Sequence, residues 1–577
     1  MIALSRSLLP TLLLTVAMCL TTHAAHAGPG PDDWKQLSLR EKIGQTVIIS
    51  TDAARERQLG GGTLKGFLDK YPVSGVFLGS WKFEQVDANL KTNTIRQLVQ
   101  EYRAGTKVPL FIQEDYEQGP GSANEEFTFV PNLMALGAGN SPELAGEFGR
   151  ILAQETRALG LNWLLNPVAD LNRNFMNPVT NTRSVSDDSE RAVRLLSHQV
   201  AAMQGHGLIA TIKHFPGDGM DFRDQHLVTS VNSLGMDEWR ASYGRVFQQL
   251  IREGVASVMI GHIALPAYQK ERHNGRLLPA SLSREIITQL LKGEMGFEGI
   301  VISDALNMGG LQSYYPTPVE TQIQAFKAGT DLMLWPSLEY FDALEQRIRS
   351  GEIPMQRLDD AVRRVWAVKH RFGLLDGRAN APVAYEPAQR QAAQAVAQRI
   401  AQASITLVRD TPPMLPLKNT TARKLLLVIV APNSLTEARR KTFAPTVAAL
   451  QARGFTVDVR SNLSYYEHDL AKFDGYDRIL FAFDRHTHAP MGTMQLYETE
   501  ALTAWSANAL PRAKVISVSY GDPYVHDVLL PLAGTAINVY SDSPVSQQAL
   551  VQALTGEIAF QGSSPVNLDA LRRTLNP

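Results

Sequence analysis

One segment of the chain, between Lys213 and His226, concentrates residue types that can transfer protons. It opens with Lys213 and His214 and ends with Asp224 two residues before His226. At that spacing the Asp224 carboxylate can accept a proton from one ring nitrogen of His226, which leaves the other nitrogen free for acid/base chemistry. The apolar, β-branched run 207–212 just before it predicts a buried strand. The polar groups therefore lie at the C-terminal end of a strand, where barrels of parallel strands carry active sites.

An Asp-x-His pair alone is a weak signal, because it also suits a surface turn with a satisfied histidine. The longer run Lys-His-Phe-Pro-Gly, from Lys213 to Gly217, resembles the signature of glycoside hydrolase family 3, in its β-N-acetylglucosaminidase branch. The resemblance implies that His226 is the general acid/base and that Asp224 orients it. It also implies that Lys213 and His214 bind sugar hydroxyls. The ordinary pKa of histidine, ~6.5, suits proton transfer near neutral pH.

The signature departs from the family pattern at one position. Asp218 stands between two glycines, where the family more often has a histidine. A further carboxylate close to His226 would favour the charged form of the imidazole. The sequence therefore predicts that Asp218 raises the pKa of His226.

A second carboxylate, Asp304, closes another buried, β-branched run, 299–303. A charged group at the end of such a strand must be solvated in a cavity or hydrogen-bonded. The alternative is a helix N-cap, since Asp is favoured there. The nucleophile of family 3 occupies this Ser-Asp position. The resemblance therefore implies that Asp304 attacks the anomeric carbon and forms a covalent glycosyl-enzyme, with overall retention of configuration.

The loop 113–119 also follows a predicted strand and carries several polar side chains. It is similar to the Asp-Gln-Glu-Gly-Gly loop of the family, which puts Asp115 in the position of a sugar-binding aspartate. Tyr116 and Gln118 depart from the family pattern. The shape of the loop and the role of Glu117 are left open for that reason.

Two further motifs supply candidate ligands for a sugar. The segments 166–170 and 181–184 are similar to the Pro-Val-x-Asp strand and the Arg-Ser-Phe segment of the family, and Arg183 would donate hydrogen bonds to sugar hydroxyls. The alternative for Arg183 is a solvated ion pair with a nearby acidic residue, Asp187 or Asp188. His262 ends a run that is similar to the Val-Met-x-x-His segment of the family. We expect it to line the cavity without transferring protons.

The N-terminus predicts export. Arg6 is followed by an apolar run from Leu8 to Leu20, and a small-x-small cleavage motif ends at residue 27. We expect a signal peptide over 1–27, a periplasmic or secreted mature chain, and no membrane span in it, since the apolar run is short. The only cysteine, Cys19, lies within this segment. Lipidation of Cys19 is an alternative that the bulky preceding methionine disfavours.

The fold class follows from the alternation of strands and helices. We predict a (β/α)₈ TIM barrel over 28–376, a linker over 377–395, and a smaller α/β sandwich domain with a parallel sheet over 396–577. The eight predicted barrel strands are 47–50, 75–78, 109–114, 162–170, 209–214, 257–262, 299–304 and 331–335. Those of the second domain are 424–431, 456–460, 478–483, 514–519 and 535–540.

Composition and motifs exclude several classes of function. The net charge of −1 gives no electrostatic reason for a nucleic-acid or anionic-membrane partner. There is no His-Glu-x-x-His motif, no cysteine after residue 27 and no phosphate-binding loop, so we predict no metal and no cofactor.

The resemblance implies a retaining β-N-acetylhexosaminidase acting on peptidoglycan or chitin fragments. A β-N-acetylglucosaminide phosphorylase and another β-glycosidase are alternatives within the family. A cell-wall-binding protein on an inactive barrel is the alternative from another class, and the intact set of candidate residues disfavours it. In relatives without the Asp-His pair the second domain supplies the acid/base. Here we expect that domain to act as a scaffold or to grip substrate.

Overall fold

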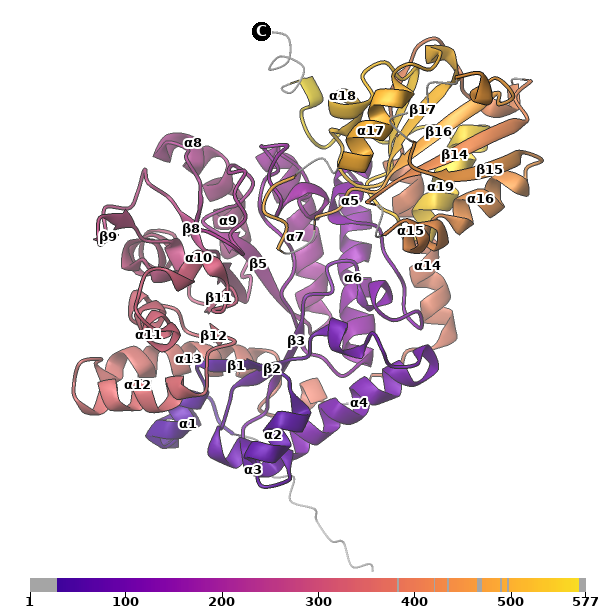
Figure 1. Cartoon of the computed structure of the whole chain (residues 1–577). Helices are drawn as coiled ribbons and strands as arrows, with labels where there is room; N and C mark the ends of the chain where they lie inside the picture. The colour runs from indigo at the N-terminus through magenta and orange to yellow at the C-terminus, as the bar shows by residue number, and fades with distance from the viewer. Residues whose placement is uncertain are drawn as a thin grey trace, which may run out of the picture.

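A computed structural model describes residues 29–569, apart from 381–382, 420, 433–434, 464–469, 488–489 and 495–497. The predicted signal peptide, 1–27, with Cys19, lies outside the described residues. Figure 1 shows a barrel that runs from indigo to pink along the chain, followed by a second α/β part in orange and yellow. The predicted fold class is confirmed.

Eight parallel strands form the barrel, in the spatial order β11-β7-β5-β4-β3-β2-β1-β12, and a bridge between Ile302 and Leu332 joins the two ends of this order. Each predicted strand is present, but β4 is much shorter than the predicted 162–170. Pro167 has no N–H to donate to the ladder, and beyond it only a single bridge joins Val168 to Lys213. The strands are β1 (Val47–Ser50), β2 (Gly75–Phe77), β3 (Phe111–Glu114), β4 (Trp163–Leu164), β5 (Ile209–Phe215), β7 (Ser257–Ile260), β11 (Ile300–Ser303) and β12 (Met333–Leu334).

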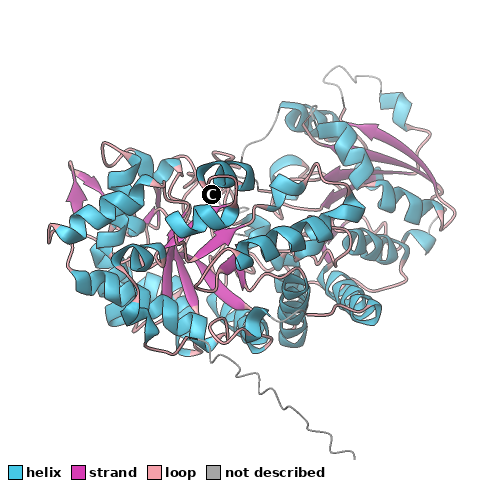
Figure 2. Cartoon of the chain, turned by 90° about the horizontal axis from the view of Figure 1, so that it is seen from below, coloured by secondary structure: helices cyan, strands magenta, loops and turns pink. Residues whose placement is uncertain are grey.

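Helices surround the strands, as Figure 2 shows from below. Their N-termini follow ordinary capping rules; in α6, for example, the Ser141 hydroxyl accepts the Leu144 N–H and Pro142 occupies the first turn. The helices are α1 (Leu39–Gly44), α2 (Ala53–Leu59), α3 (Leu64–Lys70), α4 (Ala88–Ala104), α5 (Leu133–Gly139), α6 (Pro142–Ala158), α7 (Ser189–Gly205), α8 (Met236–Ala241), α9 (Tyr243–Arg252), a π-helix (Glu285–Glu294), α10 (Gly309–Gln312), α11 (Pro318–Ala328), α12 (Glu339–Arg349) and α13 (Met355–Arg371).

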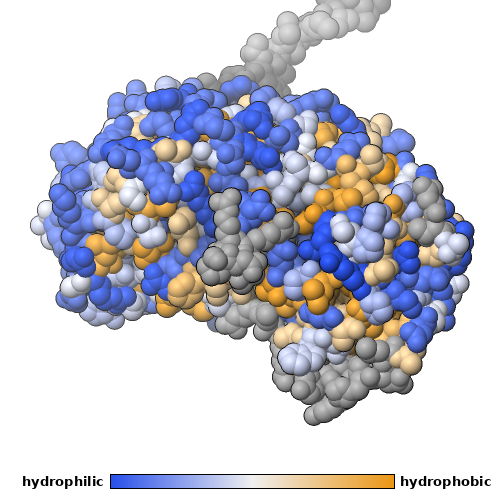
Figure 3. Space-filling view, turned by 90° about the horizontal axis from the view of Figure 1, so that it is seen from above, coloured by the Kyte–Doolittle hydropathy of each residue, from blue (hydrophilic) through white to orange (hydrophobic). Residues whose placement is uncertain are grey.

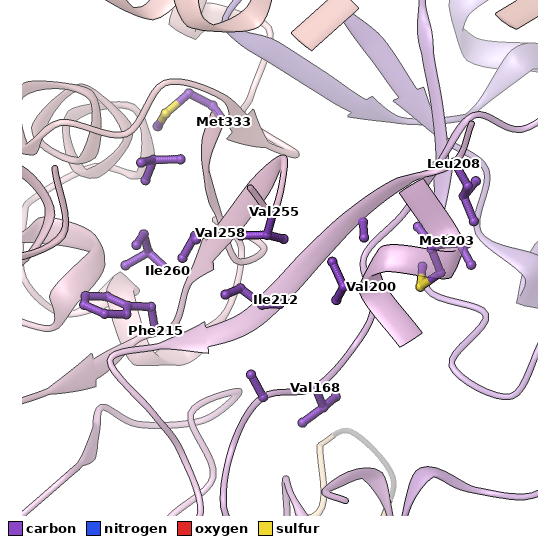
Figure 4. Close-up of a cluster of buried hydrophobic side chains, with 14 of the residues drawn as sticks. Val168, Val200, Met203, Leu208, Ile212, Phe215, Val255, Val258, Ile260 and Met333 are labelled. Carbon is purple, nitrogen blue, oxygen red and sulfur yellow. The ribbon is translucent and has the colours of Figure 1, made fainter. Parts of the chain in front are cut away.

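The barrel strands are buried on both faces. Side chains at alternate positions, among them Phe77, Phe111 and Trp163, form one cluster inside the barrel. The other positions pack outward against the helices; Figure 4 shows Ile212 of β5 beside residues of β7 and α7. Every residue of β5 is buried. Polar chemistry is therefore confined to the strand ends and to the loops that follow them.

The second part of the chain is a six-stranded sheet in the order β13-β18-β17-β16-β14-β15. Five strands are parallel and match the predicted ones, whereas β13, which was not predicted, adds an antiparallel edge. The strands are β13 (Thr406–Asp410), β14 (Lys424–Val430), β15 (Thr456–Ser461), β16 (Arg478–Phe483), β17 (Val515–Ser519) and β18 (Thr535–Asn538). The helices are α14 (Pro387–Ser404), α15 (Thr436–Thr442), α16 (Ala444–Gln451), α17 (Glu498–Ala507), α18 (Val525–Leu529) and α19 (Pro544–Thr555).

The two parts pack against each other at both ends of the second one. Helix α14 begins at Pro387, within the segment predicted as a linker, and packs against α5, α6 and α19. Near the end of the chain, the Pro565 carbonyl accepts hydrogen bonds from the Ser186 hydroxyl (2.6 Å) and the Asp187 N–H (3.2 Å) of the barrel.

None of the described helices is long and apolar enough to cross a membrane. The face of the molecule seen from above is mainly hydrophilic, with smaller apolar areas on both parts (Figure 3).

The close approach of α6 to α7 can be tested with two glycines on one helix. A Cβ atom at Gly149 would lie 2.4 Å from the Gln199 carbonyl oxygen of α7, whereas one at Gly146 would meet nothing within 4 Å. Gly149→Ala should lower the free energy of unfolding by ~1–3 kcal/mol through overpacking. Gly146→Ala should raise it by up to ~1 kcal/mol, because alanine loses less backbone entropy in a helix. Thermal melts of both variants check this, and an increase in Tm for Gly149→Ala would contradict the packing.

Candidate active site

The predicted site residues follow the C-terminal ends of neighbouring barrel strands. Asp115 follows β3, Arg183 lies in the loop after β4, Lys213 and His214 belong to β5, and Asp304 follows β11. Because parallel strands end at the same mouth of the barrel, these side chains meet there. Contacts among them and their neighbours form two groups, one around Asp304 and one around Lys213.

Asp304 lies next to a histidine that a second carboxylate orients. The His214 Nδ1–H donates to Asp170 Oδ2 (2.7 Å), and the His214 N–H donates to Asp170 Oδ1 (3.0 Å). This leaves His214 Nε2 facing Asp304 Oδ2 at 3.9 Å. Asp170 ends the segment 166–170, and no separate role was predicted for it. The Asp304 side chain is 13% exposed, which leaves it open to a ligand.

The surroundings of Asp304 favour its charged form. Burial raises the pKa of this carboxyl, but three nearby imidazoles and the Ala305 N–H outweigh burial, so the pKa lies below its ordinary value; the imidazoles belong to His214, His262 and His226. The Ala305 N–H donates to Asp304 Oδ1 at 2.7 Å. A carboxylate that is ionised at neutral pH and reachable from the barrel mouth can act as a nucleophile.

Asp224 and His226 form the hydrogen-bonded pair that their spacing predicts. Asp224 Oδ1 accepts the His226 N–H (2.9 Å) and the His226 Nδ1–H (2.6 Å). Asp224 is buried, whereas the His226 side chain is 27% exposed. Burial raises the pKa of Asp224, but hydrogen bonds from His226 and from the Met491 N–H outweigh it and lower the pKa to about 2. The pair is thus a charged carboxylate that orients an accessible imidazole.

Lys213 and Arg183 share a carboxylate that the sequence left without a role. Glu117 accepts two hydrogen bonds from the Arg183 guanidinium (2.8 and 2.6 Å) and lies 2.9 Å from the Lys213 ammonium, which also donates to Asp115 Oδ1 (2.8 Å). Arg183 therefore pairs with Glu117, not with Asp187 or Asp188. Burial raises the pKa of Glu117, but these two cations outweigh it and lower the pKa. The group presents several donors and acceptors to hydroxyls of a ligand.

His262 does not open onto the cavity as the sequence predicts. It is fully buried, and its Nε2–H donates to the Ala305 carbonyl (3.1 Å). Since a carbonyl can only accept, Nδ1 accepts from the Ser281 hydroxyl (2.9 Å). Burial lowers the pKa of His262, so the ring is neutral at neutral pH. His262 thus hydrogen-bonds the backbone of the residue that follows Asp304.

Asp218 is hydrogen-bonded to the segment that carries Asp170. Asp218 Oδ1 accepts hydrogen bonds from the Asn177 amide (2.8 Å) and the Gly219 N–H (2.6 Å), and the Asp218 N–H donates to Asp170 (2.7 Å). These contacts place it beside Asp170. Burial, together with the charge of Asp170, raises the pKa of Asp218 to about 7.

Aromatic side chains follow two other barrel strands. Trp81 comes after β2 and is 48% exposed, and Trp335 comes after β12; their ring centroids are 6.2 Å apart in an edge-to-face arrangement. Trp335 also lines a cavity of about 470 Å³ together with Ser50 and Glu339. Tryptophan rings of this kind combine apolar contact area with a polar edge.

The structure brings together one group of potential metal ligands in the second domain, although the sequence predicted none. Asp484, His486 and Asp542 offer ligand atoms within 4.8 Å of one another. The Arg439 guanidinium lies 2.6 Å from Asp484 Oδ2, and His486 Nε2 lies 2.8 Å from Asp484 Oδ1. A side-chain cation already neutralises the buried Asp484, so we interpret the group as an ion-pair cluster.

A charged carboxylate beside several hydrogen-bond donors and acceptors at a barrel mouth is an arrangement that suits glycoside hydrolysis. The model of the glycosyl hydrolase family 3 N-terminal domain matches residues 38–368. A β-N-acetylglucosaminidase/β-glucosidase of Cellulomonas fimi is 32% identical over 545 residues, which cover 91% of this chain and 93% of that protein. The chain therefore belongs to glycosyl hydrolase family 3.

Two solved structures are similar over both parts of the chain. A β-glucoside phosphorylase is 28% identical with a TM-score of 0.78, and the match covers 93% of this chain and 95% of that one. A family 3 β-N-acetylglucosaminidase of a Paenibacillus species is 28% identical with a TM-score of 0.77, and the match covers 92% of this chain and 99% of that one. The barrel followed by a second α/β domain is therefore an arrangement that these proteins share.

The raised pKa of Asp218 predicts a pH-dependent effect of Asp218→Asn. The folded protein binds this proton more tightly than the unfolded chain, so its stabilising effect is complete below ~pH 4 and is lost as the pH rises through about 7. Asparagine stays neutral beside Asp170 at every pH. The Tm of the variant minus that of the wild type should therefore increase between ~pH 5 and ~pH 8. If the Tm difference between variant and wild type were the same at both pH values, the raised pKa of Asp218 would be contradicted.

Proposed function

We propose that this family 3 enzyme is a retaining β-N-acetylglucosaminidase with Asp304 as nucleophile and His226 as general acid/base. The observation that carries the proposal is the Asp224–His226 hydrogen bond at the same barrel mouth as Asp304. Among the described residues, no hydrogen-bond partner occupies His226 Nε2. That nitrogen is thus available to a substrate.

In the first step, Asp304 attacks the anomeric carbon while the His226 imidazolium donates its Nε2 proton to the glycosidic oxygen. The bond between the anomeric carbon and that oxygen breaks, and a glycosyl-aspartate forms. In the second step, neutral His226 takes a proton from water, the water oxygen attacks the anomeric carbon, and Asp304 leaves. Two inversions give retention. Asp224 stays ionised throughout and stabilises the imidazolium.

The charged group around Lys213 would hold the sugar during both steps. Arg183 and Lys213 are hydrogen-bond donors, and Asp115 and Glu117 are acceptors. Sugar hydroxyls, which can both accept and donate, can therefore bind to either kind of group. The names of the similar proteins support an N-acetylglucosaminide as substrate. The N-terminal apolar segment supports export to the periplasm or the medium. We therefore propose terminal β-linked N-acetylglucosamine of peptidoglycan or chitin fragments.

A second candidate function is phosphorolysis of the same bond. A neutral histidine repels an incoming phosphate less than a carboxylate acid/base would, so phosphate could replace water in the second step. The likeness to a solved β-glucoside phosphorylase favours this alternative. The Cellulomonas fimi relative is named as a β-glucosidase as well, so β-glucoside hydrolysis is a further alternative.

The deciding assay compares the 4-nitrophenyl β-glycosides of N-acetylglucosamine and glucose, with and without phosphate, for the wild type, Asp304→Ala and Asp304→Asn. We expect phosphate-independent release of N-acetylglucosamine, first as the β-anomer by NMR, and no turnover by either folded variant. His226→Ala should lower kcat/KM on an unactivated disaccharide by ~10²–10⁴-fold.

Other outcomes have distinct meanings. A sugar phosphate formed only in the presence of phosphate would identify a phosphorylase. Preference for the glucoside would overturn the proposed substrate, and unchanged turnover by Asp304→Ala would overturn the proposed nucleophile.

A further inference from the structure

A loop of the second domain reaches the barrel mouth. It follows β16, and its described part 490–494 contacts the barrel at two places. The Met494 N–H and the Thr493 hydroxyl both donate to the Met176 carbonyl (3.1 Å each). Two residues earlier, the Met491 N–H (2.8 Å) and the Gly492 N–H (3.2 Å) both donate to Asp224 Oδ2.

These donors complete the hydrogen bonding of the Asp224 carboxylate. Among the described residues, Asp224 Oδ1 accepts from His226, and Oδ2 accepts from the second domain. Two successive backbone N–H groups form a concave anion site of the kind called a nest. Gly492 has a φ of +88°, a conformation that glycine adopts without the strain a side chain would bring.

The barrel holds the segment that carries Asp224 and His226 with few buried apolar contacts. Phe222, Leu227 and Val228 are 53%, 49% and 48% exposed, so they do not anchor this segment in the core. Its position therefore depends on polar contacts, such as the Gly309 N–H that donates to the His226 carbonyl (2.7 Å). The nest fixes the plane of the carboxylate that orients the imidazole.

We infer that Met491 and Gly492 are positioning residues for the acid/base pair: their N–H groups hold Asp224 so that His226 presents Nε2 to the glycosidic oxygen. The inference rests on the proposed function. The second domain would then assist proton transfer without donating the proton itself, because Met491 and Gly492 act only through Asp224.

Met491→Pro tests this, because proline removes one of the two donors. We expect kcat/KM on an unactivated β-N-acetylglucosaminide disaccharide to fall about tenfold, as for the loss of one hydrogen bond to a charged group. On the 2,4-dinitrophenyl glycoside, whose leaving group needs no proton, it should change by less than about twofold. Thr493→Val removes the hydroxyl bond to Met176 but keeps both donors, and should lie within about twofold of wild type on both substrates.

A double-mutant cycle separates positioning from a general structural effect. If Met491 acts through Asp224, Met491→Pro should change kcat/KM by less than about twofold in the Asp224→Ala background. An equal loss on both substrates, or a full further loss in that background, would overturn the inference. Thermal melts verify that each variant folds. If proline prevents folding, an ester in place of the Met491 amide removes the N–H alone, and the same expectations apply.

The outcome also separates this inference from the proposed function. A wild type that hydrolyses neither substrate, or an Asp304→Ala variant that still does, overturns both. A wild type that depends on Asp304 and His226 but tolerates Met491→Pro overturns the positioning role alone.

Discussion

Burial of both faces of the barrel strands is the constraint on which the rest of the structure depends. A strand such as β5, in which every residue is buried, can carry apolar side chains along its length but charged ones only where it ends. Parallel strands end at one mouth, so the charged residues of several strands must meet there. Once they meet, each charge needs a partner, and the pairs Asp170–His214, Glu117–Arg183 and Asp224–His226 provide them.

The pairs are of two kinds: carboxylates that orient a histidine, and a carboxylate that neutralises two cations. His214 and His226 each donate from Nδ1 to a carboxylate, which leaves the Nε2 atom of each ring outside that hydrogen bond. Glu117 instead gathers the two cations, so that neither Arg183 nor Lys213 is buried without a countercharge. Asp304 has no lysine or arginine in direct contact among the described residues, and nearby imidazoles lower its pKa. A charged carboxylate that forms no salt bridge with a lysine or arginine remains available to form a covalent bond.

Strand patterns and motif spacing predicted the eight barrel strands, the five parallel strands of the second sheet and the Asp224–His226 contact, because each depends on residues close together in the chain. The rest depends on long-range contacts. Neither the pairing of Glu117 with Arg183 nor the burial of His262 has a local signature. The segment 166–170 did end in a carboxylate, Asp170, and that position was a usable signal. The N–H donors of Met491 and Gly492 are backbone groups, so no side-chain pattern marks them.

The segment around Pro565 joins the second domain to a loop of the barrel. The Pro565 carbonyl accepts from Ser186 and Asp187, and the Ser184 hydroxyl next to Arg183 lies within hydrogen-bond distance of the Asp170 and Ser186 carbonyls. The segment around Pro565 thus contacts the loop that carries Arg183. In a barrel excised at residue 376, the Ser186 hydroxyl and the Asp187 N–H would lose this acceptor and would need water or another group in its place.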